Sequence, residues 1–253
     1  EIQRLTQALA LEKQNTLNVS AQPQQQTAVQ LKQKVTTNEV ESNKSSQQLI
    51  ALNIQFYDPK EFLNSVNQSV SVPFFKLCQL FLDKSIDLCV KHYQIDPTVI
   101  QVDQIFNAEG ATLSTMGEQE NALECLMMIG AVFQLLSDVL YKRYREDKRF
   151  ALQTRGAVAS AVEAMQLDAI ESAKRLTQHL SAKEAALHLN HDQLKLIQNC
   201  YDLVAMPNPS NIMTRHAFMI HGMNEDCAKL AQNLRTEILM GKKAKVATDT
   251  STL

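Results

Sequence analysis

The sequence predicts an all-α fold, an irregular bundle of about seven or eight helices preceded by a polar, partly extended N-terminal arm. The 253-residue chain contains only six glycines and six prolines. Average usage in a chain of this length would give about 18 and 13. Sheet proteins use these residues in hairpins and turns, so their scarcity favours long elements with few connections. Pro59, Pro73 and Pro97 each precede an apolar run with helical spacing, which suits the first turn of a helix.

Residues 1–57 are predicted to form the polar arm, which begins with a short helix. The remainder of the arm is rich in amide and hydroxyl side chains, and Val29, Leu31 and Val35 are too sparse for a continuous apolar stripe. Such a segment buries too little apolar surface to fold alone, so we expect it to become ordered on a partner. Leu49–Phe56 alternates in part like a strand. A lone strand has no pairing partner, so an extended arm or a helix end is favoured.

The helical domain is predicted to run from residue 58 to residue 241 and begins with clear helix signals. Asp58 is placed to cap a first helix, and Glu61 stands where a capping-box carboxylate belongs. In the next helix, Pro73–Tyr93, apolar residues recur at steps of three and four. A short helix is expected to follow from Pro97.

A long central helix is predicted at Glu118–Arg149, after a loop at residues 107–117 that contains two glycines. Its middle is apolar on nearly every face, which is typical of a helix surrounded by other helices. The most apolar part, Ala122–Tyr141, still contains Glu124 and Asp138. A membrane span rarely carries two carboxylates, so the sequence indicates a buried helix instead.

The C-terminal half is predicted to continue as helices. In Ala157–Leu180, small and apolar residues recur at steps of three and four, close to the seam of a coiled coil. Ser181 and Glu184 then form an S-x-x-E box that predicts the start of another helix. A last helix is expected to end at Gly241, before a polar tail of residues 242–253.

The charge and the cysteines indicate the class of partner and the compartment. The formal net charge is −2. The chain therefore lacks the basic excess of nucleic-acid-binding modules, and we expect no nucleic acid partner. The five cysteines have no C-x-x-C spacing, and all lie within apolar runs, namely Cys78, Cys89, Cys125, Cys200 and Cys227. They are predicted to be buried free thiols in a reducing compartment, which indicates the cytoplasm.

One group of residues has the composition of a metal site. His188, His191 and Asp192 would lie within reach of each other and of Glu184 on a continuous helix, but a helix restart near Asn190 breaks this geometry. The sequence contains no G-x-S-x-G, P-loop, G-x-G-x-x-G or H-E-x-x-H motif. We therefore predict no catalytic, cofactor-binding or metal-ligating residue.

Two further regions are candidates for contact with a partner protein, in addition to the arm. Basic residues gather at the end of the long central helix, and methionines gather after the Pro-rich break at residues 207–209, where they could form an adaptable docking groove. With the arm, the predicted docking residues are Val29, Leu31, Val35, Lys142, Arg143, Arg145, Arg149, Met213, Phe218, Met219 and Met223.

These observations predict a non-enzymatic interaction protein, an adaptor or structural subunit of a larger intracellular complex. Bacterial secretion-machine adaptors and effectors include bundles of this kind. One alternative is a ligand-binding or metal-binding helical-bundle enzyme with its site between helices, near His188, His191 and Asp192. Another is a protein that binds phosphate surfaces, nucleic acid or an anionic membrane, through the basic residues between Lys142 and Arg155.

Overall fold

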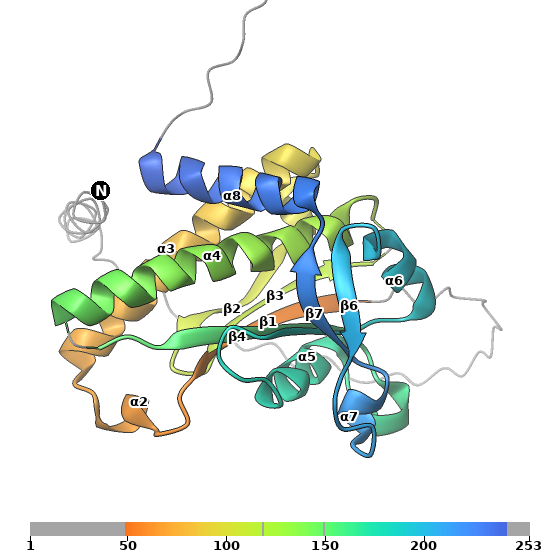
Figure 1. Ribbon diagram of the computed structural model, residues 1–253, viewed down its shortest axis with the longest axis horizontal. Helices are drawn as coiled ribbons and strands as arrows, with labels where there is room; N and C mark the ends of the chain where they lie inside the picture. The colour runs from red at the N-terminus through yellow and green to blue at the C-terminus, as the bar shows by residue number, and fades with distance from the viewer. Residues whose placement is uncertain (1–48, 118, 149, 242–253) are drawn as a thin grey trace, which may run out of the picture. The chain divides into compact units, whose positions relative to one another are not determined.

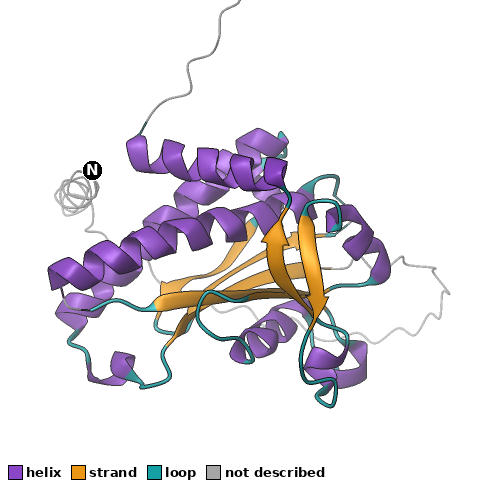
Figure 2. Ribbon diagram, in the orientation of Figure 1, coloured by secondary structure: helices purple, strands orange, loops and turns teal. Residues whose placement is uncertain are grey.

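The computed structural model describes residues 49–117, 119–148 and 150–241. These residues fold around a seven-stranded mixed sheet with the strand order β2-β3-β1-β4-β5-β7-β6. The strands are drawn in orange in Figure 2. The prediction of an all-α bundle is therefore wrong. The strands are β1 Leu49–Tyr57, β2 Gln101–Asn107, β3 Gly110–Met116, β4 Gln153–Ser160, β5 Ala185–His188, β6 Tyr201–Ala205 and β7 Phe218–Met223.

Helices cover both faces of this sheet (Figure 1). The long helices α3 and α4 pack on one face with α8, whereas α5 and α7 lie on the other face. Strands β4 and β5 pair in parallel, and the other neighbouring strands pair antiparallel. The helices are α2 Phe62–Ser65, α3 Gln68–Tyr93, α4 Ala122–Lys148, α5 Ala169–Gln178, α6 His191–Ile197, α7 Ile212–Arg215 and α8 Glu225–Met240, and two short 3-10 helices span Pro97–Val99 and Glu163–Met165.

Strand β1 lies in the middle of the sheet. The sequence predicts an extended arm or a helix end for this segment. That interpretation is wrong because β1 does have partners: Leu52 is paired with Leu113 of β3 and with Val158 of β4. Its side chains alternate between the two faces, as expected for a strand. Phe56 contacts Phe74 of α3 with 5.5 Å between ring centroids. The strand lies within residues 1–57, which are predicted to form the arm. Its pairing with β3 and β4 makes it part of the folded sheet instead.

The alanine-rich seam predicted as one helix is divided between a strand and a helix. Ala159 of β4 and Ala51 of β1 pack against Ala169 and Ala173 of α5, and all four are buried. The small side chains do permit close packing, as predicted, but between a sheet and a helix. The helix expected from Ser181 is also wrong. The Ser181 backbone N–H donates to Glu184 Oε2 at 2.6 Å, yet the chain continues as strand β5.

Residues 107–117, expected as a loop, form the turn of the β2–β3 hairpin and all of β3. Gly110 makes this turn possible, since it has a φ of 96° and lies against β1. A Cβ atom at Gly110 would lie 1.9 Å from the Ile54 carbonyl oxygen, so the position needs glycine. The hairpin buries Ala111 and Leu113 against the helices, which a loop would leave exposed.

Several helix predictions are confirmed. Helix α3 ends at Tyr93, and α8 ends before Gly241, which has a φ of 62°. The cap predicted at Asp58 is wrong, because α2 begins at Phe62 with Glu61 as its N-cap, although the Asp58 carboxylate does accept hydrogen bonds from the backbone N–H groups of Phe62 and Leu63. Within the described ranges, only Ala122–Glu146 is long and apolar enough to cross a membrane. Within this helix, 61% of the most apolar 18-residue segment is buried inside the domain, as in a core helix.

The cysteines divide into two groups. Cys200 and Cys227 form a disulfide that joins the start of β6 to α8, so the prediction of free thiols is wrong for these two. Cys78, Cys89 and Cys125 are free and buried, as predicted. Burial raises the pKa of the Cys125 thiol to about 12, and the pKa values of the other two free thiols are raised by the same cause. A protonated, buried thiol is a poor nucleophile, so these three have a packing role.

Candidate functional site

Two arrangements of side chains stand out in the described part of the chain, one on each face of the sheet. The first lies on the face covered by α5, and we call it the basic cluster. It consists of Gln55 on β1, Gln104 on β2, Arg155 on β4 and Lys174 on α5. All four side chains are half-buried. They gather near the end of the sheet where β1 finishes and β4 begins, because Gln55 is paired with Arg155 in the sheet register.

Hydrogen bonds connect the members of the basic cluster. Arg155 Nη1 donates to the Leu180 carbonyl oxygen at 2.7 Å, and Arg155 Nη2 donates to Gln55 Oε1 at 3.4 Å. Lys174 Nζ donates to Gln104 Oε1 at 3.0 Å. Gln55 Nε2 in turn donates to the Lys174 carbonyl oxygen at 3.4 Å. The two cations are therefore held by neutral oxygens.

The electrostatic balance of the basic cluster is unusual. In residues 49–117, 119–148 and 150–241, no ion pair includes Arg155 or Lys174. Burial lowers the pKa of the Arg155 guanidinium, yet an arginine stays charged at neutral pH. Arg155 Nε is also buried without a hydrogen-bond partner. Charges removed from water are normally paired, so two half-buried cations without a carboxylate favour a bound anion.

Two carboxylates lie at the same end of the sheet as the basic cluster. Asp58 directly follows β1, and Glu109 lies in the turn between β2 and β3. Since β3 pairs antiparallel with β1, this turn reaches the end of the sheet at which β1 finishes. Carboxylate oxygens are the ligands that Mg²⁺ prefers. This end of the sheet therefore combines two cations suited to an anion with two carboxylates.

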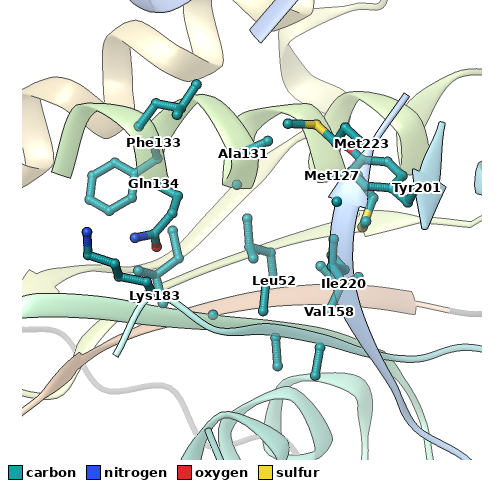
Figure 3. A pocket seen from close by; sticks show the side chains of 18 of the residues that line it. Leu52, Met127, Ala131, Phe133, Gln134, Val158, Lys183, Tyr201, Ile220 and Met223 are labelled. Atoms are coloured by element: carbon teal, nitrogen blue, oxygen red, sulfur yellow. The ribbon is translucent and has the colours of Figure 1, made fainter. Parts of the chain in front are cut away.

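The second arrangement is a cavity between α4 and the opposite face of the sheet, which we call the α4 cavity. Its volume is about 210 Å³. The walls are mainly apolar and come from α4, β1, β4 and β7, including Leu52, Met127, Ala131, Val158, Ile220 and Met223 (Figure 3).

The α4 cavity has polar groups at both ends. Gln134 and Lys183 lie together at one end, and Tyr201 lies at the other end (Figure 3). Gln134 Oε1 accepts a hydrogen bond from Thr154 Oγ1 at 3.1 Å, whereas Gln134 Nε2 is buried without a partner. Lys183 Nζ pairs with Asp138 Oδ2 at 3.0 Å, near the surface. An apolar cavity with a few converging polar groups is the usual form of a small-molecule site.

The histidines singled out by the sequence do not come together. His188 ends β5, and burial lowers its pKa, whereas His191 and Asp192 begin α6. The restart near Asn190 occurs as expected, because Asn190 caps α6 in a capping box. Asp192 pairs with Lys195 at 3.0 Å. Within the described ranges, no three His, Cys, Asp or Glu side chains are placed to hold a metal ion together.

The predicted docking residues are scattered over the domain. Val29, Leu31, Val35 and Arg149 lie outside the described residues. Lys142, Arg143 and Arg145 are exposed on α4. Met213 is buried in a core cluster, Phe218 and Met219 are half-buried on β7, and Met223 lines the α4 cavity. The methionines thus belong to the interior and to a cavity wall.

The residues of the basic cluster were missed by reasoning from the sequence. The available signal was the alternation of β1, in which Asn53, Gln55 and Tyr57 occupy one face. Accepting that strand would have placed Gln55 on a sheet face rather than in an arm. Lys174 lies in the segment predicted to be a helix with a coiled-coil seam, and a lysine outside the seam of such a helix normally lies on the solvated side.

Solved structures provide one informative likeness. The adenylyl cyclase CyaB from P. aeruginosa resembles 71% of this chain and 96% of its own chain, with a TM-score of 0.51 and 10% sequence identity. The match to the guanylyl cyclase Cya2 covers 70% of this chain and 93% of the cyclase chain, with a TM-score of 0.48 and 10% identity. The match to the adenylate/guanylate cyclase/hydrolase from Silicibacter pomeroyi covers 68% of this chain and 95% of the other, with a TM-score of 0.44 and 14% identity. The sequence matches no protein-family model and no curated protein.

The first of these likenesses establishes a shared fold and corrects the functional prediction. The non-enzymatic adaptor was inferred from the lack of a catalytic motif, the near-neutral charge and the amide-rich arm, and its secretion-machine role from an all-α bundle. The chain instead has an α/β fold found in an adenylyl cyclase. That prediction is wrong. The expected protein partners and cytoplasmic location stay predictions.

Proposed function

We propose that this chain is a nucleotidyl cyclase domain, which binds a nucleoside triphosphate and converts it to a cyclic nucleotide and pyrophosphate. The observation that carries the proposal is the basic cluster, in which Arg155 and Lys174 are half-buried without a carboxylate partner. A triphosphate supplies the missing negative charge. The shared fold supports the same chemistry, since an adenylyl cyclase has this arrangement of strands and helices.

The reaction needs charge stabilisation more than covalent chemistry from the protein. The 3′-hydroxyl oxygen attacks the α-phosphorus, the bond from this phosphorus to the α,β-bridging oxygen breaks, and pyrophosphate leaves with its electron pair. The hydroxyl proton passes to water. Arg155 and Lys174 would offset the charge that develops on the phosphate oxygens, as cations do in other phosphoryl transfers.

A divalent metal ion is expected in such a reaction, and Asp58 and Glu109 are the candidate ligands at this end of the sheet, with no third His, Cys, Asp or Glu among the described residues placed beside them. Asp58 and Glu109 would hold it through carboxylate oxygens, and the ion would polarise the phosphate oxygens. Gly110 fixes the position of the turn that carries Glu109, because its backbone lies directly against Ile54 of β1.

Nucleotide binding without turnover is a second candidate. One observation favours it: each Asp58 carboxylate oxygen already accepts a backbone N–H from the start of α2, at 2.9 and 2.8 Å. These bonds leave the carboxylate with fewer free lone pairs for a metal ion. Both candidates require the basic cluster for the triphosphate, and they differ only in product formation.

The test measures binding and turnover separately. The purified chain is titrated calorimetrically with ATP and with GTP in the presence of Mg²⁺ or Mn²⁺, and the same mixtures are analysed by chromatography for cyclic nucleotide and pyrophosphate. A charge-assisted hydrogen bond contributes about 1.5–3 kcal/mol, so Arg155→Met and Lys174→Met should each weaken binding at least about tenfold. Lys195→Met is the matched control, because Lys195 is exposed on α6 and pairs with Asp192.

The outcomes separate the two candidates. Binding with cyclic product supports the cyclase, and binding without product supports the second candidate. If neither nucleotide binds, or if Lys195→Met weakens binding as much as the two cluster variants do, both candidates are wrong.

A further inference from the structure

The α4 cavity lies on the sheet face opposite the basic cluster, and the proposed nucleotide chemistry gives it no role. Leu52 and Ile54 of β1 line the cavity, whereas Gln55 of the same strand belongs to the basic cluster. Alternate residues of one strand point to opposite faces, so the two sites are separated by the sheet itself. An occupant of the cavity must therefore be recognised by the cavity walls alone.

The cavity is partly open to solvent, and its size is beyond the gaps that ordinary packing leaves between side chains. Protein interiors contain few voids larger than a water molecule. An engineered apolar cavity of about 150 Å³ stays dry and binds benzene. At about 210 Å³ the α4 cavity is larger, so it has room for a six-membered ring with a short substituent.

Small residues on facing elements create this space. Gly130 and Ala131 of α4, Gly156 of β4 and Ala185 of β5 all line the cavity. A Cβ atom at Gly130 would make ordinary contact with Leu52 Cδ2, at 3.4 Å. Larger side chains at these positions would have filled the gap between helix and sheet.

The polar end of the cavity defines the second feature of the occupant. Gln134 Nε2 is buried without a hydrogen-bond partner, although Gln134 Oε1 is satisfied by Thr154. Figure 3 shows the Gln134 amide at the same end of the cavity as the Lys183 ammonium group. The Lys183 ammonium group is already paired with Asp138, whereas Gln134 Nε2 has no partner, and a buried unpaired donor costs free energy until an acceptor reaches it.

We propose that the α4 cavity binds a small, mainly apolar molecule that carries one acceptor oxygen, such as a monocyclic aromatic ketone or carboxylate. The ring occupies the space between Met127, Val158 and Ile220, and the oxygen accepts from Gln134 Nε2 beside Lys183. The inference does not depend on nucleotide binding, because none of these residues belongs to the basic cluster.

The test uses methyl NMR of the full chain labelled at the methionine methyl groups. Met127 and Met223 line the cavity, and Met240 is exposed on α8 and serves as the internal control. Acetophenone and phenylacetate are the probes with an acceptor oxygen, and toluene is the probe without one. We expect both acceptor probes to shift the Met127 and Met223 signals but not the Met240 signal. Acetophenone should bind about fivefold more tightly than toluene, because it satisfies Gln134.

Variants connect the signals to the cavity. Ala131→Leu fills it from α4 and should abolish the shifts, and Ile220→Phe fills it from the sheet in case the first variant folds poorly. Gln134→Met keeps the size of the side chain and should remove the preference for acetophenone over toluene. Ala228→Leu on α8, away from the cavity, should change nothing. Absence of shifts up to the solubility limit of every probe, or shifts that persist in both filled variants, would overturn the proposal.

Discussion

Replacing Ala131 by leucine should stabilise this protein, although enlarging a side chain in a protein interior normally destabilises it. Ala131 lies on α4 and borders a cavity of about 210 Å³, so the added atoms have space. The substitution adds three carbon atoms, and each buried methylene contributes about 0.8 kcal/mol. The transfer contribution is therefore at most about 2.4 kcal/mol, because Ala131 is half-buried and the cavity is partly open to solvent. Fixing one leucine side chain costs about 0.5–1 kcal/mol, which leaves a net gain of up to about 1.5 kcal/mol.

Urea denaturation followed by circular dichroism measures this gain as a higher midpoint with an unchanged slope. The melting temperature should rise by about 3–6 °C, as expected for a domain of this size. The control is Ala159→Leu on β4, because Ala159 is fully buried against Ala169 and Ala173 on the other face of the sheet. This control should lose about 1–3 kcal/mol through overpacking. If Ala131→Leu is as destabilising as Ala159→Leu, the space inferred between α4 and the sheet does not exist.

Three further predictions concern the scaffold. Gly110→Ala should lower the free energy of unfolding by more than about 2 kcal/mol in the same urea assay, since φ is 96° and the added Cβ would meet the Ile54 carbonyl oxygen; a neutral result contradicts the hairpin. Cys227→Ser should destabilise the oxidised protein by about 3.6 kcal/mol, from closure of the loop back to Cys200, and should have little effect under reducing conditions; equal effects in both conditions contradict the disulfide. Burial lowers the pKa of His188, so its neutral form is favoured in the folded state, and its contribution to stability is full above the unfolded pKa of about 6.5 and is lost as the pH falls. His188→Gln should therefore flatten the decline in stability between about pH 7 and pH 5, and an unchanged slope excludes this role.

The helices were the part of the fold that local sequence specified well. Helix α4 was recognised because its apolar residues continue on nearly every face for about five turns, a pattern that few other structures share. The end of α3 at Tyr93 and the end of α8 before Gly241 follow from signals within one turn of each end. Such signals depend on neighbours in the sequence, so no knowledge of distant residues was needed.

The strands could not be recognised in the same way. Strands β5 and β6 have four and five residues, and apolar runs this short fit a buried strand or a helix segment equally well. Glycine and proline scarcity was also misleading, since the β2–β3 turn needs only Gly110 and the other connections of the sheet pass through helices. Counting turn residues therefore underestimated the strands.

The candidate sites depended even more on the tertiary structure. The basic cluster unites β1, β2, β4 and α5, and the Arg155–Gln55 hydrogen bond joins residues 100 positions apart. The α4 cavity is defined by what small side chains such as Gly130 and Ala131 leave unfilled, and no motif encodes empty space. A lysine such as Lys174 is ordinary in a sequence, and only its burial away from carboxylates gives it a candidate role.

The sequence by itself determined the long buried helices, the cap at Asn190, and the glycine end of α8, because each depends on contacts within a few residues. Only the tertiary structure decided that Leu49–Tyr57 is a central strand, because its hydrogen-bond partners lie in β3 and β4, about 60 to 100 residues further along the chain. The sheet that these pairings build then decided the rest. It places the basic cluster on one face and the cavity on the other.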